Sequence, residues 1–219
     1  MYDYAYSDSE TDAIARLSKW YSGDIHDSME ALGLWGHLDG ISLLGTLAPG
    51  AVVCGPAVTV LFEPSDRKGE PQDVYHNAID NVPAGGILVV DASCAAGSCS
   101  GELMSSGAHT AGAAATVVNG TVRDLAQVRA LGYPLFGTAP SPVGVTGKKE
   151  PMHSQVPITI GRTTVTPGDV IFGDIDGVVC IPRSKLVAVA DQADALGRDE
   201  AQARARILAG EKLQAVWPV

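Results

Sequence analysis

Near the N-terminus, the hydrophobic residues recur at helical spacing. Five apolar residues between positions 10 and 21 fall on one face of a helix: Ala13, Ile14, Leu17, Trp20 and Tyr21. Ser9 and Asp12 are candidates for the capping pair of this helix. A second, short helix is predicted from Asp24 to Gly33, because glycine commonly ends a helix.

From residue 51 onward, continuous apolar runs alternate with helical patterns. The segment AVVCGPAVTVLF at 51–62 predicts a strand, and its Gly55-Pro56 pair predicts a bulge or an edge position. Buried strands are then predicted at 86–91, 115–120 and 133–138, with helices at 101–112 and 124–132. Strands that alternate with helices in this way indicate a parallel sheet with crossover helices.

The pattern changes again after residue 138. Residues 139–155 are typical of a loop, and 156–182 contain short β-rich runs separated by tight turns, which indicates antiparallel strands. Residues 184–213 predict one or two amphipathic helices. We therefore expect one α/β domain over 1–219, with N-terminal helices in 1–50, a β/α core in 51–183 and C-terminal helices in 184–219.

Composition and charge exclude several functional classes. Hydrophobic residues make up 46% of the chain and charged residues 18%, so the chain can bury a full core. The formal net charge of −10 argues against nucleic acid as a partner, since such proteins need a basic face. Neither a membrane-length apolar run nor the basic and apolar parts of a signal peptide are found. We expect a cytoplasmic protein without a membrane partner.

The segment 97–127 combines two features that suit a binding site. Its small-residue loop ends in Gly101–Met104 at a predicted helix start, where free backbone N–H groups can hold an anion. The following strand ends at Asn119-Gly120 and leads into Arg123 and Asp124. Ligands bind at the carboxyl ends of strands in α/β sheets. There an arginine can grip a carboxylate and an aspartate can hold a hard divalent cation. The alternative is a helix-capping aspartate beside a surface arginine.

These residues belong to a longer pattern. The chain resembles the RraA-like family in the signature of that family, because Glu102 is followed, after twenty residues, by Arg123-Asp124. That family includes class II 4-hydroxy-4-methyl-2-oxoglutarate/4-carboxy-4-hydroxy-2-oxoadipate aldolases and the regulator of ribonuclease activity A. Further matching segments follow in order: Asp27-Ser28, Ala31-Leu32-Gly33, Gly55 through Thr59, Gly86 through Asp91, Gly132 through Phe136, Pro167-Gly168-Asp169 and Asp176 through Val179. The resemblance covers nearly the whole chain and implies a swivelling β/β/α-type sandwich, with a parallel central layer, an antiparallel layer and flanking helices.

The resemblance also implies roles for the residues of the signature. Asp124 would bind Mg²⁺ or Mn²⁺, and Glu102 would contact the metal through a water molecule. Arg123 would bind the carboxylate of a small 2-oxo acid. The loop at Gly101 and the amides that follow it, those of Leu103 and Met104, would hold the 2-oxo acid end.

In the family, the site lies between the subunits of a trimer or of a dimer of trimers. A carboxylate from the neighbouring subunit's C-terminal helix completes it through a water molecule. In this chain the candidate is Glu200, with Asp199 as the alternative. The expected assembly is therefore a homo-oligomer.

The activity implied is a metal-dependent lyase reaction. A 4-hydroxy-2-oxo acid would undergo retro-aldol cleavage to release pyruvate, with Arg123, Glu102 and Asp124 as the catalytic residues. Oxaloacetate decarboxylation passes through the same metal-stabilised enolate, so one site could catalyse both reactions.

One position departs from the family pattern. Active aldolases usually have Asp or Glu three residues after the aspartate of the signature, where this chain has Gln127. We expect Gln127 to lie one helical turn from Asp124, facing the site, and to weaken metal binding or alter the base. Two alternatives stay open: a pathway-specific enzyme with other enolate chemistry, and a non-catalytic protein that regulates a ribonuclease through protein contacts.

Overall fold

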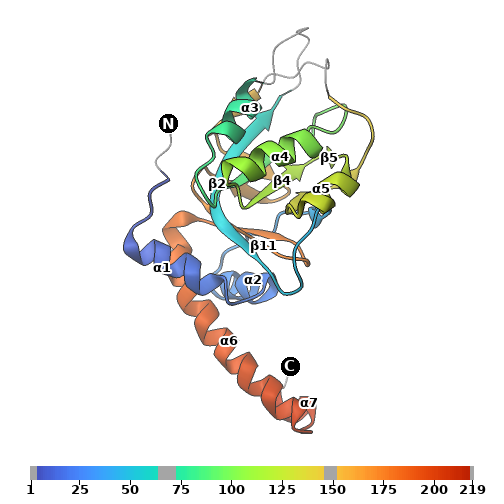
Figure 1. The fold of residues 1–219 in the computed structure, drawn as a ribbon. Helices are drawn as coiled ribbons and strands as arrows, with labels where there is room; N and C mark the ends of the chain where they lie inside the picture. The colour runs from blue at the N-terminus through green and yellow to red at the C-terminus, as the bar shows by residue number, and fades with distance from the viewer. Residues whose placement is uncertain (1–3, 64–72, 146–151, 218–219) are drawn as a thin grey trace.

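A computed structural model describes residues 4–63, 73–145 and 152–217, and a curled mixed sheet forms its centre (Figure 1). Its eight strands are β1 (Ser42–Leu43), β2 (Val53–Phe62), β3 (Ile87–Asp91), β4 (Ala115–Asn119), β6 (Leu135–Gly137), β8 (Met152–Ser154), β11 (Val170–Gly173) and β12 (Val178–Ile181). The order is β1-β6-β4-β3-β2-β11-β12, and β8 also pairs with β2. Strands β2, β3, β4 and β6 run parallel, whereas β1, β8, β11 and β12 join antiparallel. The predicted α/β fold, with its parallel and antiparallel parts, is confirmed.

Two smaller ladders accompany this sheet. Strands β9 (Ile158–Ile160) and β10 (Thr163–Val165) form an antiparallel hairpin, as the turn-separated runs of this region predict. Strands β5 (Thr121–Val122) and β7 (Ala139–Pro140) pair in parallel beside the end of β4.

The helices fall into two groups (Figure 1). Helices α3 (Asp73–Asp80), α4 (Glu102–Ala111) and α5 (Leu125–Leu131) connect the parallel strands, as crossover helices do. Helices α1 (Asp8–Leu17), α2 (Ser22–Ala31) and α6 (Leu186–Leu208) pack together at the antiparallel end of the sheet. The short η1 (Arg183–Lys185) precedes α6, and α7 (Leu213–Val216) follows it.

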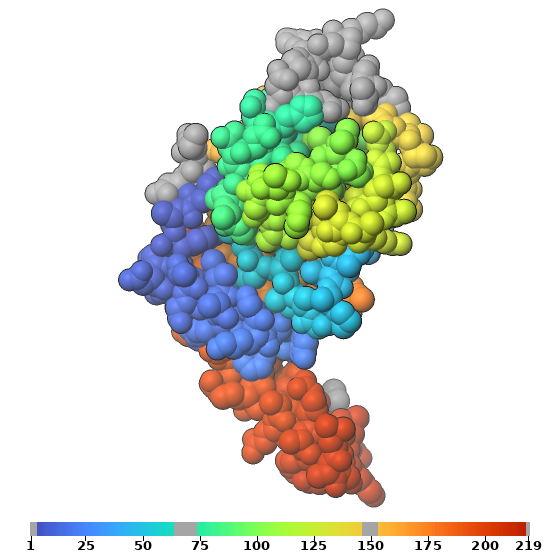
Figure 2. Space-filling view, in the orientation of Figure 1, coloured from blue at the N-terminus to red at the C-terminus, as the bar shows by residue number. Residues whose placement is uncertain are grey.

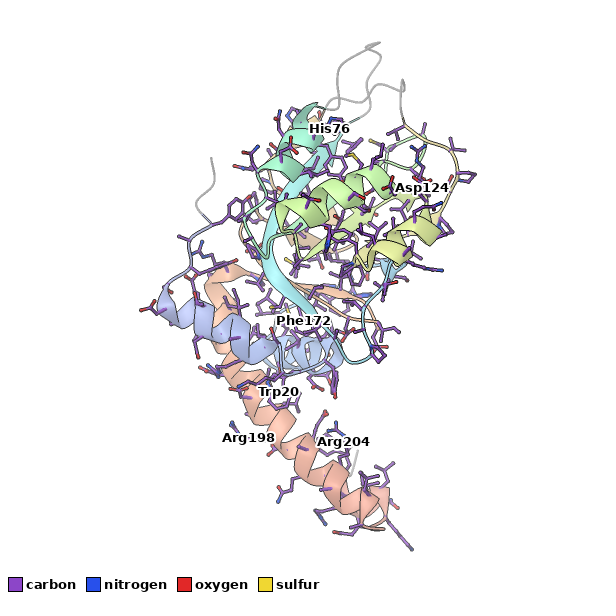
Figure 3. All side chains as sticks on the ribbon, in the orientation of Figure 1. Trp20, His76, Asp124, Phe172, Arg198 and Arg204 are labelled. Carbon is purple, nitrogen blue, oxygen red and sulfur yellow. The ribbon has the colours of Figure 1, made fainter. Side chains whose placement is uncertain are left out.

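The core has three parts, which follow these layers. One contains apolar residues of β2, β3 and β4 together with α3, α4 and α5, and a second joins the other face of the sheet to the β9–β10 hairpin. The third packs α1, α2 and α6 against β11 and β12, with Phe172 fully buried (Figure 3). Since the parallel strands are covered on both faces, β3 and β4 consist of continuous buried runs.

The first helix is bounded differently from the prediction. It begins after Ser7, whose hydroxyl accepts a hydrogen bond from the Glu10 N–H while the Glu10 carboxylate accepts one from the Ser7 N–H. The predicted capping pair, Ser9 and Asp12, is wrong, because this Ser7–Glu10 capping box satisfies the first turn. The second helix begins at Ser22 and ends before Gly33, which has a φ of 70°.

Strand β2 is not broken at Gly55-Pro56, where a bulge or an edge was predicted. Its residues Val53 to Pro56 pair with β11, and its residues Ala57 to Leu61 pair with β3. The pair therefore marks the point at which one continuous strand changes its neighbour. Gly55 is required there, because a side chain would collide with the Gly85 carbonyl.

Helix α6 extends away from the body of the molecule toward α7 (Figures 1 and 2). Its first half is anchored by the buried residues Leu186, Val189, Ala190 and Ala193, whereas Leu208 near its end is 81% exposed. Among the helices that the structure describes, none has the length and apolar character needed to cross a membrane.

Candidate active site

A cavity of about 330 Å³ opens where the chain leaves the carboxyl ends of β3 and β4. This is the edge of a parallel sheet at which ligands bind. Its lining residues come from the loop before α4, the first turn of α4, the segment before α5, α3 and the end of the 141–145 segment: His76, Ser98, Cys99, Ser100, Gly101, Glu102, Leu103, Met104, Arg123, Asp124 and Val145.

Backbone hydrogen bonds join the two signature segments beneath this cavity. The Arg123 N–H donates to the Ser100 carbonyl at 3.0 Å, and Ser100 also forms a bridge with Val122. The Ser98 hydroxyl donates to the Ser141 carbonyl at 2.7 Å, which ties the same loop to the segment after β7. The loop before α4 is thus held against the residues that precede α5.

Asp124 has a left-handed backbone conformation, with φ of 57° and ψ of 34°. It occupies the position before the first turn of α5, but its carboxylate does not cap that helix. Instead, Asp124 Oδ2 accepts a hydrogen bond from the Glu102 N–H at 3.2 Å and lies 3.4 Å from Arg123 Nε. A non-glycine residue held in this strained region commonly marks a functional position. Asp124 therefore does not cap α5, the helix that it precedes, but its carboxylate satisfies the first free N–H group of α4.

Gly101 permits this close approach. A Cβ at this position would overlap Asp124 Oδ2 and would lie 2.9 Å from Arg123 Cγ. The absence of a side chain at Gly101 is therefore what lets the carboxylate reach the start of α4. The N–H groups of Leu103 and Met104 follow in the first turn, where an α-helix offers no internal acceptor.

Six of the residues predicted from the sequence meet at this cavity: Gly101, Glu102, Leu103, Met104, Arg123 and Asp124. The Glu102 carboxylate accepts a hydrogen bond from the Ser106 hydroxyl at 3.0 Å, one turn along α4. The side chains of Arg123 and Asp124 are each 41% exposed, so both are accessible to a ligand.

Glu200 lies elsewhere in the chain. It is on α6, one turn before Arg204, and Figure 3 shows Arg204 far from Asp124. Burial, together with the negative charges of Asp24 and Asp27, raises the pKa of the Glu200 carboxyl. A single chain thus does not bring Glu200 to the cavity.

Gln127 also differs from the expectation. Its backbone N–H donates to the Asp124 carbonyl at 3.0 Å, but its side chain is exposed and does not line the cavity. Gln127 is the third residue of α5, and the buried side of this helix is formed by its neighbour Val128.

Sequence reasoning did not assign a role to five residues that line the cavity: His76, Ser98, Cys99, Ser100 and Val145. Ser98 and Ser100 are almost fully buried in a loop whose small residues gave no individual signal. His76 on α3 comes from a segment about 25 residues before the signature, so no local motif connects the two. The available clue was that the helix of His76 precedes β3, a parallel strand whose carboxyl end lies beside the site.

Comparisons with known proteins agree with this geometry. A family model described as RraA-like, Aldolase/RraA, matches residues 22–180. Protein DlpA of Legionella pneumophila is 30% identical over 213 residues, which cover 95% of this chain and 34% of DlpA, so the chain spans about a third of that protein. A Halalkalibacterium halodurans protein named "Putative 4-hydroxy-4-methyl-2-oxoglutarate aldolase" is 33% identical over 179 residues, which cover 77% of this chain and 80% of that protein.

Two solved structures are similar to this chain over nearly their whole length. An uncharacterized protein from Pseudomonas syringae pv. tomato has a TM-score of 0.83 at 26% identity, with coverage of 96% of this chain and 99% of the other. Streptomyces coelicolor RraAS2, described as an unusual member of the RNase ES inhibitor RraA protein family, has a TM-score of 0.80 at 28% identity, with coverage of 89% and 98%. With the family model matching residues 22–180 and the signature residues gathered at one cavity, this chain belongs to the RraA-like family.

Proposed function

We propose that this protein is a divalent-metal-dependent lyase. It cleaves a C–C bond in a 4-hydroxy-2-oxo acid to release pyruvate, decarboxylates oxaloacetate, or does both. The observation that carries the proposal is the meeting of Arg123, Asp124 and the first turn of α4 in one cavity at the sheet's carboxyl edge. The name of the H. halodurans relative supports the same class of reaction.

The residues present fit a hard divalent cation. Asp124 and Glu102 offer carboxylate oxygens, which Mg²⁺ and Mn²⁺ prefer. With neutral histidine, the described lining residues carry one positive charge from Arg123 and two negative charges, a net charge of −1. A net negative cavity repels an anionic substrate, and a divalent cation would reverse that sign. Asp124 would hold the cation directly, and Glu102 would contact it through water.

A bound cation would supply Lewis acidity that stabilises the enolate formed when the C–C bond breaks. Arg123 would bind the carboxylate of the 2-oxo acid with its planar guanidinium group. The N–H groups of Leu103 and Met104 would orient the same end of the substrate. Since Asp124 would hold the cation, Glu102 is the other carboxylate of the cavity and would accept the 4-hydroxyl proton, directly or through water.

Glu200 would reach the site from a neighbouring subunit of a homo-oligomer, as a trimer or a dimer of trimers. Support comes from α6, which carries Glu200 beside α2 and then extends beyond the body of the molecule (Figure 1). Asp199 stays the alternative. A mass of one chain in light scattering would contradict a shared site.

The test is pyruvate release from 4-hydroxy-4-methyl-2-oxoglutarate and from oxaloacetate, with Mg²⁺, with Mn²⁺ and with a chelator. We expect chelator-sensitive release above the rate of the free metal. Asp124→Asn should abolish it while preserving the fold, because asparagine tolerates the left-handed backbone. Arg123→Ala should lower both binding and turnover, whereas Arg129→Ala, an exposed arginine on α5 outside the cavity, is the matched control. Equal rates in Asp124→Asn and the wild type would refute the site.

A second candidate is regulation of a ribonuclease through protein contacts. The observation that favours it is the similarity to RraAS2 over 98% of that chain. A pull-down with an RNase E-type enzyme, followed by a cleavage assay, separates the two proposals, because Asp124→Asn would leave a purely protein-mediated inhibition intact.

A further inference from the structure

His76 brings a second nitrogen donor to the cavity from a different element. Helix α4 packs against both α3 and α5. Arg123 and Asp124 therefore approach its first turn from the α5 side, and His76 approaches it from the α3 side (Figure 3). His76 also borders the groove between α3 and α4, together with Leu103 and Met104.

The packing of α3 fixes the direction in which His76 points. Its neighbour Tyr75 is 1% exposed and packs edge-on against Phe62 of β2, with ring centroids 6.3 Å apart. Ala78 and Ile79 are buried as well. Tyr75 faces the sheet, whereas Ile79, one turn after His76, borders the groove between α3 and α4. His76 is exposed and lies on this side of α3, beside the first turn of α4.

The cavity offers few groups that can bind a second anionic end of a substrate. Among the described lining residues, only Arg123 and His76 carry side-chain nitrogen donors. The other charged side chains, Glu102 and Asp124, would repel a carboxylate. A volume of about 330 Å³ falls within the range of small-molecule sites, so one ligand can contact both sides of α4.

We propose that His76 is a specificity-determining residue, which binds the distal carboxylate of a 2-oxo dicarboxylic acid whose 2-oxo end is held at Arg123. This inference rests on the proposed function. An imidazole N–H donates a hydrogen bond to the distal carboxylate, and in retro-aldol cleavage that carboxylate leaves with the second product. His76 thus selects the substrate, whereas the signature residues act on the reacting bond.

The experiment measures binding of two ligands by calorimetry in the presence of Mg²⁺. Pyruvate has only the 2-oxo end, whereas 2-oxoglutarate adds a distal carboxylate. In His76→Phe we expect the ratio of the 2-oxoglutarate Kd to the pyruvate Kd to rise about tenfold or more, since a hydrogen bond to a charged group is lost. His76→Gln, which keeps an N–H donor, should recover part of the difference. His109→Gln, an exposed histidine on α4 outside the cavity, is the control and should leave the ratio unchanged.

A kinetic readout separates this inference from the proposed function. KM is measured for 4-hydroxy-4-methyl-2-oxoglutarate and for its analogue with a methyl group in place of the distal carboxylate. His76→Phe should raise the KM of the dicarboxylate about tenfold more than the KM of the methyl analogue. If the wild type binds pyruvate and cleaves the substrate, but His76→Phe changes neither the Kd ratio nor the KM ratio, the role of His76 is overturned and the proposed function stands. Failure of the wild type to bind pyruvate or to release it would overturn the proposed function and, with it, this inference.

Discussion

Replacing Gly101 with alanine tests how the cavity is built. The residue has an extended backbone, with φ of −155° and ψ of −157°, which alanine can adopt, so the perturbation is the added methyl group. That methyl group would lie 2.9 Å from Arg123 Cγ and nearer still to Asp124 Oδ2. Since nonbonded carbon contacts are about 3.5 Å or longer, the carboxylate must move by about 1 Å.

A displacement of this size has a predictable effect on catalysis. A misplacement of about 1 Å in a catalytic group can cost roughly 10²-fold in rate, so we expect Gly101→Ala to lower kcat/KM by about that factor. The affinity for Mn²⁺, measured by calorimetry, should fall as well, because Asp124 would hold the cation. The melting temperature should change little, since the side chains of Arg123 and Asp124 are each 41% exposed and can move into solvent.

Gly107 supplies the matched control on the same helix. A Cβ there would lie 3.4 Å from Ile79 Cγ2, which is an ordinary contact. Gly107→Ala should therefore keep kcat/KM within about twofold of the wild type while adding up to about 1 kcal/mol of helix stability. If Gly101→Ala also stays within about twofold, with unchanged Mn²⁺ affinity, then the close approach of Asp124 to Gly101 has no role in the site.

Three further predictions concern other parts of the chain. Gln127→Glu should change kcat/KM by less than about twofold, because the side chain is exposed and outside the cavity; a tenfold rise in pyruvate release would show that its charge reaches the site. Gly197→Ala should lower the melting temperature despite alanine's helix propensity, because the Trp20 ring occupies the space of the methyl group and overpacking costs about 1–3 kcal/mol; unchanged thermal unfolding would contradict that packing. The hydrogen bond from Arg183 is the main cause that lowers the pKa of Glu10 from 4.5 to about 2, so Glu10→Gln should lower the free energy of unfolding by about 1 kcal/mol at neutral pH, after allowance for solvent screening. A carboxyl group whose pKa is lower in the folded protein stabilises the fold at pH values above its pKa in the unfolded chain. The difference in unfolding free energy between wild type and Glu10→Gln should therefore shrink as the pH falls from 4.5 to 2, as measured by denaturant titrations; a difference that stays constant would refute the assignment.

The sequence by itself determined the elements with strong local signals. Continuous apolar runs such as 86–91 are buried parallel strands, because such strands are covered on both faces and need no polar alternation. The signature residues could also be placed, since Gly101 through Met104 precede a helix and Arg123 and Asp124 follow a strand. Both segments must then lie at the same edge of a parallel sheet.

The tertiary structure decided what depends on contacts between distant segments. Strand β2 changes its neighbour at Gly55-Pro56, because β11 returns from more than 100 residues away to pair with it. The orientation of the Asp124 carboxylate depends on an N–H group of α4, 22 residues earlier, and no local rule distinguishes that bond from a cap on α5. His76 reaches the cavity because Tyr75 is packed against Phe62. Glu200 lies apart from the cavity because α6 packs with α1 and α2 at the antiparallel end of the sheet. Local patterns specify backbone periodicity, but side-chain direction at a site is fixed by packing between elements that the sequence keeps far apart.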